Sequence, residues 1–330
     1  MRFLPVAALL GAISSPCLAQ TSPGLDPKGT LSITYENDKF GNTDRQYTNG
    51  FRLSYLSATT EIPDWMDRLR GDLAPVLSSS GAVRWGLSFG QNLYTPDDTG
   101  RRTLITDDRP YAAWTYFSFS LMTDTGDRLD TLALDLGVIG PVALGEEVQN
   151  NVHRLVGVDT AEGWDNQLRN EPGVNLVYER RWRMGRQFGI GDLGVDMTPQ
   201  ASASLGNVFT HAAAGAVFRL GADLPSDYGP PRIRPALAGG GLFRGVDGLG
   251  WYLFAGFEGR AVLRDITLDG NSFRDSHNVN KEPLVGEAQL GFAVTWNNTR
   301  LAFTYDLRTR EFEGQDRNVR FGSLSLSYRF

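Results

Sequence analysis

The chain has 330 residues, 38 acidic and 32 basic side chains, a formal net charge of −6 and a single cysteine. This acidic balance, without clustered basic residues, offers no surface for nucleic acid, and one cysteine cannot form a disulfide framework. Beyond the amino-terminal segment, no run approaches the 18 consecutive apolar residues of a membrane-spanning helix, which excludes a helical membrane protein.

The amino-terminal segment has the order of a secretory signal peptide. Arg2 precedes an apolar run at residues 3–13, and the small residue Ala19 follows at a suitable cleavage position. We therefore expect residues 1–19 to be removed and residues 20–330 to form a single domain.

Two other interpretations of this segment are weaker. A membrane anchor needs roughly 20 apolar residues, more than this run supplies. A lipoprotein signal at Cys17 is disfavoured because Pro16 precedes it in place of a small residue. Since Cys17 leaves with the signal peptide, we expect a mature chain without cysteine.

Residues 34–55, TYENDKFGNTDRQYTNGFRLSY, predict a strand, a polar crossing and a second strand. A hairpin needs only a few Gly, Asn or Asp residues to turn. This crossing holds many more polar side chains, namely Glu36, Asn37, Asp38, Asp44, Arg45, Tyr47, Thr48 and Asn49. The excess indicates a functional site.

Strict alternation of apolar and polar residues recurs along the chain. In the final segment, GSLSLSYRF, Leu324, Leu326, Tyr328 and Phe330 share one face, and serines and an arginine share the other. A soluble β-sandwich also alternates. Here, however, the second face is polar, as in a lumen, and aromatic residues gather near strand ends, as in a membrane-interface girdle. We therefore predict an all-β fold, a transmembrane antiparallel β-barrel of the bacterial outer membrane.

Thirteen segments have this character: 30–37, 50–57, 83–92, 113–122, 130–139, 173–183, 191–205, 210–220, 232–243, 251–264, 284–296, 299–308 and 321–330. Bacterial single-chain barrels close with an even number of strands, so one segment does not belong. The Pro- and Gly-rich segment 232–243 is the weakest, which leaves twelve strands and both termini on the periplasmic side. The loops at 38–49, 93–112 and 140–172 then lie together on the outside face.

The third of these loops contains GEEVQNNVHRLVG, residues 145–157, which predicts a short amphipathic helix. Its apolar stripe consists of Val148, Val152 and Leu155. At roughly 100° per residue, Gln149 and His153 stand one turn apart on a different face. A lone histidine is more often a surface or core residue, but this one is expected opposite the polar crossing. The helix therefore presents an imidazole beside an amide.

Two chemistries fit His153 and Asp38. If Asp38 and neighbouring carbonyls bind a hard cation, oxygen ligands without thiols favour calcium, and His153 is free to deprotonate water as a general base. Alternatively, a nucleophilic serine or threonine with histidine makes a triad-like hydrolase. No G-x-S-x-G elbow is present, so the version with metal and water ranks higher.

Several motifs together resemble the lipid A 3-O-deacylase family, LpxR. They are YENDKF with TDRQYTNG, then GQNLYTP, DRPYA, GVIGP, GEEVQNNVHRLVG and LDGNSF, followed by the terminal strand. The resemblance runs from about residue 31 to residue 330 in the same order. The EEVQN block with its histidine is specific, whereas a short piece such as YTNG would mean little alone.

The resemblance implies a twelve-stranded barrel that hydrolyses the 3'-linked acyloxyacyl ester of lipid A in the outer leaflet, with calcium as its cofactor. By motif position, Asn37 and Asp38 match the family's Asn-Asp pair, Thr48 its threonine after tyrosine, and Gln149 and His153 its helix pair. His153 is implied as the base and Asp38 as a calcium ligand, with calcium stabilising the developing oxyanion. We expect a monomer whose partners are lipopolysaccharide and the outer membrane.

Two positions depart from the family pattern. Arg101 and Arg102 stand where a family member carries lysine, and Asp159 replaces a glutamate six residues after His153. An arginine can still contact an anion with two hydrogen bonds, so Arg101 and Asp159 stay candidates.

Two non-enzymatic alternatives remain. One is a passive porin or structural barrel with polar loops, although conducting porins usually have about 16 to 18 strands. The other is a barrel of this family that binds lipopolysaccharide without cleaving it.

Overall fold

The computed structural model describes residues 24–41, 46–74, 76–187, 193–222, 224, 227–233 and 241–330. The expected signal peptide at residues 1–19 lies outside the described residues, as do Asp44 and Arg45 of the polar crossing. No helix among the described residues is long and apolar enough to span a membrane.

The described strands form one antiparallel sheet. They are β1 (Thr30–Asn37), β2 (Gln46–Leu56), β3 (Ala82–Thr95), β4 (Ala112–Asp124), β5 (Arg128–Ile139), β6 (Glu171–Trp182), β7 (Met184–Gln187), β8 (Leu193–Gly206), β9 (Phe209–Ala222), β10 (Leu249–Asp265), β11 (Leu284–Trp296), β12 (Thr299–Arg308) and β13 (Val319–Arg329). Both β6 and β7 pair with β8, so β7 continues β6 and the sheet closes as a barrel of twelve strands. The predicted barrel and its strand number are confirmed.

The first and last strands of the chain, β1 and β13, pair with each other. Their register runs from Thr30 opposite Arg329 to Asn37 opposite Gly322. The pairing of β6 with β8, from Asn175 opposite Gly206 onward, closes the barrel. In a membrane each unsatisfied backbone group costs several kcal/mol, so the ladder has to be complete.

Alternation gives each strand two different faces. On β1, Leu31 and Ile33 are exposed on the outside of the barrel, whereas Ser32 and Thr34 are buried in the lumen. Odd-numbered positions of β1 therefore face outward and even-numbered positions face inward. An apolar outer band around a polar interior is the pattern of an outer-membrane barrel.

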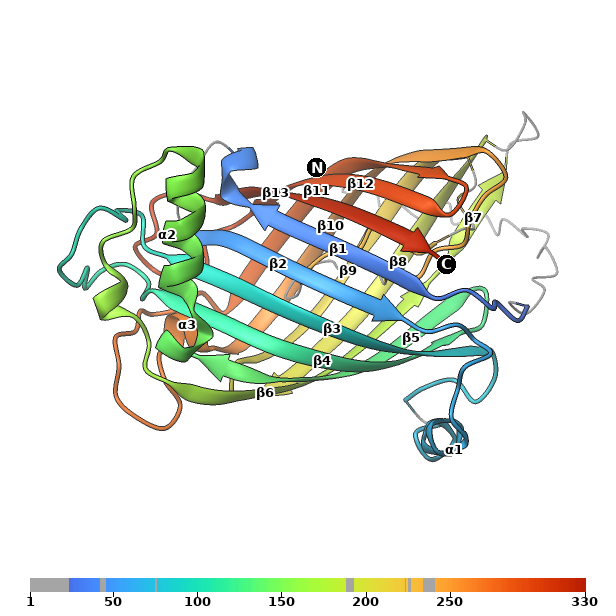
Figure 1. Ribbon diagram of the computed structural model, residues 1–330, viewed down its shortest axis with the longest axis horizontal. Coiled ribbons are helices and arrows are strands. Elements are labelled where there is room, and N and C mark those ends of the chain that lie inside the picture. Colours follow the sequence, from blue (N-terminus) through green and yellow to red (C-terminus); the bar gives the residue numbers. More distant parts are fainter. Residues whose placement is uncertain are drawn as a thin grey trace, which may run out of the picture.

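The barrel has two rims, which we name after the helices that they carry (Figure 1). The α2 rim carries η1 (Asp38–Gly41), η2 (Pro141–Ala143), α2 (Gly145–Val156), η3 (Trp164–Asn166) and α3 (Ile266–Asp269). The α1 rim carries α1 (Asp64–Asp72) and the carboxyl end of the chain. The described parts of the three polar loops expected on one face lie together at the α2 rim.

Part of the connection between β9 and β10 enters the lumen. Most of segment 232–243, residues 234–240, lies outside the described residues, but its Arg232 and Ile233 are described and buried. A cluster that includes Tyr94, Trp114 and Phe321 occupies the lumen near the α2 rim. A lumen cavity beside Arg232 has a volume of about 50 Å³, enough for one or two water molecules.

Candidate functional site

Helix α2 packs on the outer face of the barrel. Its approach is fixed by η2, where the carbonyl oxygen of Ala143 accepts hydrogen bonds from Gln91 Nε2 at 2.6 Å and Thr115 Oγ1 at 2.9 Å. Gln91 lies in register with Thr115, on the same face of β3 as the exposed Leu87 and Phe89. Figure 1 shows α2 running across the ends of β2, β3 and β4.

The carboxyl end of α2 depends on a glycine. Gly157 has φ +73°, in the left-handed region, which most other residues enter at a cost of roughly 1–2 kcal/mol. It lets the chain reverse, so that the backbone N–H of Val158 donates to the carbonyl oxygen of His153 at 2.9 Å. This reversal carries Asp159 back toward the helix.

His153 is buried, and its Nδ1 lies 2.6 Å from the backbone carbonyl oxygen of Asp159. A carbonyl oxygen can only accept a hydrogen bond, so Nδ1 carries the proton. In the neutral imidazole, Nε2 then has the free lone pair. Asp159, a candidate because of its carboxylate, contributes its backbone here.

Gln149 is held one turn before His153. Its Oε1 accepts a hydrogen bond of 2.8 Å from the indole Nε1 of Trp164, and both side chains are buried. Within the described part of the chain, Gln149 Nε2 has no hydrogen-bond partner. A buried donor without a protein partner costs free energy.

The apolar stripe predicted on α2 is buried only in part. Val148 packs against the cluster of Leu93, Ala113 and Trp164, but Leu155 has 86% of its surface exposed. The face that contacts the barrel combines Val148 with the buried Gln149 and His153. Polar side chains can occupy this face because Trp164 and the Asp159 carbonyl supply their hydrogen bonds.

A second polar group lies at the junction of β1 and β2. Asn37 donates from Nδ2 to the carbonyl oxygen of Thr48 at 3.0 Å, and its Oδ1 accepts from the backbone N–H of Lys39. Asp38 begins η1 and is fully buried. It is close enough to the Tyr35 hydroxyl to interact with it electrostatically.

Thr48 is the extra residue of a β-bulge. The register between β2 and β3 shifts between Tyr47 and Asn49, and the Thr48 hydroxyl lies 2.6 Å from that of Thr95. Bulges re-aim side chains near functional sites. Here the bulge turns a hydroxyl toward Thr95, two positions along β3 from Leu93.

The two polar groups share the α2 rim and the outer side of the wall. Asn37 lies on the outward face of β1 and is in register with Asn49 on β2. Asn49 is in register with Leu93 on β3, and Leu93 packs with Trp164, the partner of Gln149. The structure thus brings the predicted residues of β1, β2 and α2 to one region.

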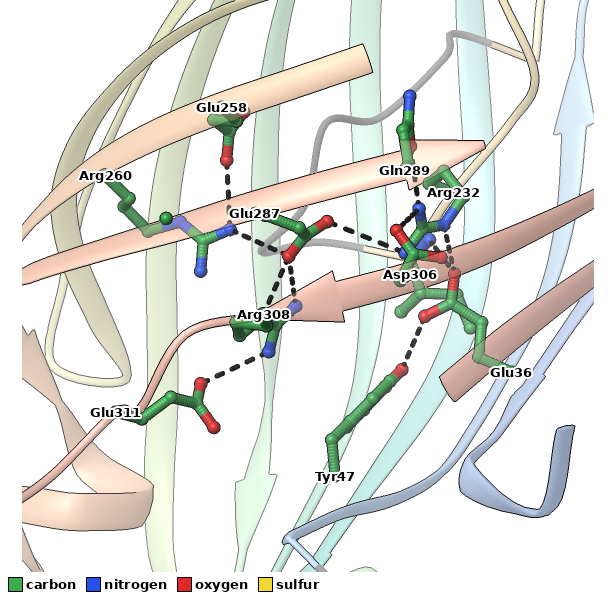
Figure 2. Close-up of polar contacts among 12 residues, drawn as sticks. Glu36, Tyr47, Arg232, Glu258, Arg260, Glu287, Gln289, Asp306, Arg308 and Glu311 are labelled. Carbon is green, nitrogen blue, oxygen red and sulfur yellow. Dashed lines mark hydrogen bonds and ion pairs between the residues drawn. The ribbon is translucent and has the colours of Figure 1, made fainter. Parts of the chain in front are cut away.

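A charged network lies directly behind this region, inside the lumen (Figure 2). Glu36 accepts hydrogen bonds from Arg232 Nε at 2.7 Å, from the backbone N–H of Ile233 at 3.1 Å and from the Tyr47 hydroxyl at 2.9 Å. Arg232 also donates to Asp306 at 2.6 Å. Glu36 and Tyr47 precede Asn37 and Thr48 in the chain, so the network holds the same two strands from the other side.

Sequence reasoning missed Arg232. Its segment shows only a weak strand pattern, and no local signal indicates that a long connection enters the lumen. Glu36 and Tyr47 were noted for their polarity, but their partner became visible only in the folded chain.

The network continues along β11 and β12 toward the α2 rim (Figure 2). Arg308 donates to Glu287 at 2.8 Å and to Glu311 at 3.2 Å, and Arg109 reaches Glu311 at 3.2 Å. Burial by itself raises the pKa of Glu311, but Arg308 and Arg109 lower it below its ordinary value. These buried charges are paired, as a low-dielectric interior requires.

The two arginines at the family's lysine position have different surroundings. Arg101 is exposed, donates to Thr103 at 2.9 Å and lines a cavity of about 290 Å³ at the α2 rim. Arg102 donates to Glu162 at 2.8 Å, and this contact lowers the pKa of that carboxyl. A β-carbon at Gly163 would lie 2.8 Å from the Arg101 carbonyl oxygen. The loop that contains Arg101 therefore passes close to Gly163, the residue before Trp164, and lies near the polar side chains of α2.

A cation at this rim would meet oxygen donors. Asp38 offers a buried carboxylate, and Asn37 and Thr48 offer amide, hydroxyl and carbonyl oxygens, the hard ligands that calcium prefers. No three His, Cys, Asp or Glu side chains gather into a potential metal site among the described residues. Asp38 is thus the one carboxylate of this donor set, and carbonyls, water or substrate would have to supply the other ligands of a calcium ion.

Comparison with known proteins agrees with this architecture. The family model described as "Outer membrane protein LpxR" matches residues 4–330. The structure of LpxR from Salmonella typhimurium is similar with a TM-score of 0.75 and 24% sequence identity, over 91% of this chain and 100% of that chain. The β domain of the Bordetella autotransporter Brka gives a TM-score of 0.41 at 10% identity, over 93% of this chain and 100% of that chain. No curated protein matches the chain.

Proposed function

The chain belongs to the LpxR family of outer membrane proteins, and on that premise we propose that it hydrolyses the 3'-linked acyloxyacyl ester of lipid A. The substrate is lipopolysaccharide in the outer leaflet, and the α2 rim faces the cell exterior.

One observation carries this proposal: a buried histidine with a fixed tautomer lies on the outer wall of the barrel, where the apolar band ends. Leu87, Phe89 and Phe117 are exposed outward on β3 and β4, and Gln91 and Thr115 follow on the same faces toward α2. An ester whose acyl chain lies along this band would reach the polar wall under α2. A substrate in the lumen would not.

The apolar side chains at the α2 rim suit the same substrate. Val142, Leu144 and Leu155 expose more than half of their surface around α2. Monomeric soluble proteins seldom leave such residues together in water, because contiguous exposed apolar patches mark interaction sites. We assign these residues to contact with acyl chains beside the reacting ester.

In the proposed reaction, His153 Nε2 takes a proton from water, and the water oxygen attacks the acyl carbonyl carbon. The ester C–O bond breaks, the proton passes to the sugar oxygen, and the products are a free fatty acid and a sugar hydroxyl. General-base catalysis of this kind contributes about 10² to 10⁴-fold.

Gln149 would stabilise the developing oxyanion through its Nε2, because Trp164 already binds its Oε1 and fixes the direction of the amide. A pre-oriented donor costs no reorganisation in the transition state. Asn37 and Thr48 would orient the substrate from the facing strands, and Arg101 would bind an anionic group of lipid A.

We propose calcium as the cofactor, held by Asp38 with oxygen atoms of neighbouring residues. When bound, a divalent cation polarises an ester carbonyl.

The alternatives differ in observable ways. A conducting porin needs an open lumen, and the described lumen holds the Arg232 segment and the Tyr94 cluster. A barrel that only binds lipopolysaccharide needs neither a fixed imidazole tautomer nor an oriented amide.

Mass spectrometry of lipid A from cells with and without the protein tests the proposal. We expect loss of the mass of the 3'-linked acyloxyacyl group. Unchanged lipid A, with the protein folded in the outer membrane, would favour the binding-only alternative.

A further inference from the structure

The segment between β2 and β3 folds back onto the outer wall at the α1 rim. Its Leu77 is fully buried in a cluster with Val83 and Leu121. Val83 and Leu121 are on the outward faces of β3 and β4, because they alternate in register with the exposed Leu87 and with Phe119 opposite it. The segment that contains α1 is therefore outside the barrel.

The axis of α1 lies across the barrel axis. Figure 1 shows α1 end-on, beside the wall and level with the ends of the strands, while the strands run across the view. A helix in this position lies parallel to the plane of a membrane that surrounds the barrel.

The side chains of α1 are distributed as such a position requires. Met66 is buried against the protein, whereas Trp65 exposes 52% and Leu69 exposes 39% of its surface. Trp65 and Leu69 are one turn apart and share one edge of the helix. Asp67 is exposed on the opposite side, two positions from each of them.

An aromatic girdle adjoins the start of α1. Trp85 donates from Nε1 to the carbonyl oxygen of Glu61 at 3.1 Å, three residues before the helix begins. The Trp85 ring lies 5.3 Å from that of Tyr55, which in turn lies 6.3 Å from Phe330. Aromatic girdles mark the lipid–water interface of outer-membrane barrels, so α1 leaves the wall at that level.

We propose that α1 is an interfacial anchor that inserts Trp65 and Leu69 into the bilayer leaflet at the α1 rim. Amphipathic helices in a membrane plane bury their apolar edge about 5–10 Å deep. Tryptophan suits this boundary because its ring is apolar and its N–H can meet water or headgroups. This role depends on the outer-membrane location and not on the proposed hydrolysis.

Site-directed spin labelling tests the anchor in the full mature chain, refolded in phospholipid vesicles. Nitroxides are attached to single cysteines in Trp65→Cys and Leu69→Cys, with Asp67→Cys as the matched control on the opposite side of the same helix. We expect oxygen to relax the labels at 65 and 69 more than a water-soluble nickel chelate does, and the reverse at 67.

Two outcomes would overturn the proposal. Equal access of the nickel chelate to all three positions would place the helix in water. Protection of positions 65 and 69 from both reagents would show that protein covers them.

A second measurement needs no cysteine. Lipids brominated near the headgroup should quench the tryptophan fluorescence of the wild type more than that of Trp65→Phe. Equal quenching of the two proteins would contradict insertion of Trp65.

Discussion

The imidazole Nδ1 of His153 lies 2.6 Å from the backbone carbonyl oxygen of Asp159. This contact leaves Nε2 as the basic nitrogen and makes its orientation depend on the chain reversal at Gly157, whose φ is +73°. A backbone partner also explains how aspartate can stand at a position where the family pattern has glutamate.

The proposed general base gives the first prediction. His153→Ala should lower deacylase activity by about 10² to 10⁴-fold, because no other group then accepts the proton of water. Asn151→Ala, an exposed change on the same helix, is the control and should keep activity. Purified variants are compared on lipopolysaccharide by mass spectrometry. Normal deacylation by His153→Ala would disprove the mechanism.

The second prediction separates the backbone of Asp159 from its side chain. Asp159→Ala keeps the carbonyl that binds His153, so activity should stay far above that of His153→Ala. Gly157→Ala should reduce activity, because alanine adopts the left-handed conformation at a cost of roughly 1–2 kcal/mol. No neighbouring atom lies within 4 Å of the added methyl group, so the effect comes from the backbone and not from a clash. Lower activity in Asp159→Ala than in Gly157→Ala would show that the carboxylate of Asp159 takes part in catalysis.

Calcium removal is the third prediction. A chelator should abolish hydrolysis, and added calcium should restore it, because Asp38 would no longer hold the cation that polarises the ester. Asp38→Asn should raise the calcium concentration needed for half-maximal activity, since one anionic ligand is lost. Activity that persists in excess chelator would reject the metal.

The fourth prediction concerns the lumen network behind the site. Arg232→Ala leaves Glu36 and Asp306 buried without their shared cation, and breaking a buried pair typically costs about 3–5 kcal/mol. We expect a lower urea midpoint in unboiled gel migration. Activity should also fall, because Glu36 adjoins Asn37.

An exposed ion pair supplies the control for Arg232→Ala. Arg102→Ala removes a contact with Glu162 at the surface, where water screens the charges, and should change the urea midpoint little. Equal urea midpoints for the two variants would show that the buried ion pairs of Arg232 do not stabilise the barrel.

The fifth prediction is a pH dependence of stability. Because Arg308 and Arg109 lower the pKa of Glu311 in the folded protein, Glu311 stabilises the fold above its unfolded pKa of about 4.3. That contribution is lost as pH falls through the lower folded pKa. Glu311→Gln should therefore flatten the acid side of the profile of urea midpoint against pH.

Glu313→Gln, an exposed neighbour in the same loop, is the matched control for Glu311→Gln. Its profile should follow that of the wild type. Parallel profiles for Glu311→Gln and the wild type would remove Glu311 from the acid response.

The amino-acid sequence alone determined the barrel. Alternation of period two is a local property, since successive side chains of a strand point to opposite faces, and it predicted the barrel of twelve strands. It also predicted that the polar loops share a rim, because that follows from strand count and order. The identity of Asn37, Thr48, Gln149 and His153 as candidates came from their motifs.

Only the tertiary structure decided how these residues are used. The Asp159 carbonyl reaches His153 because Gly157 reverses the chain, and the buried face of α2 is the one with Gln149 because Trp164 meets it there. Leu155, a member of the predicted apolar stripe, is exposed, since another face of α2 contacts the barrel wall. Arg232 binds Glu36 across 196 positions of the chain, and no local pattern encodes a contact of that range.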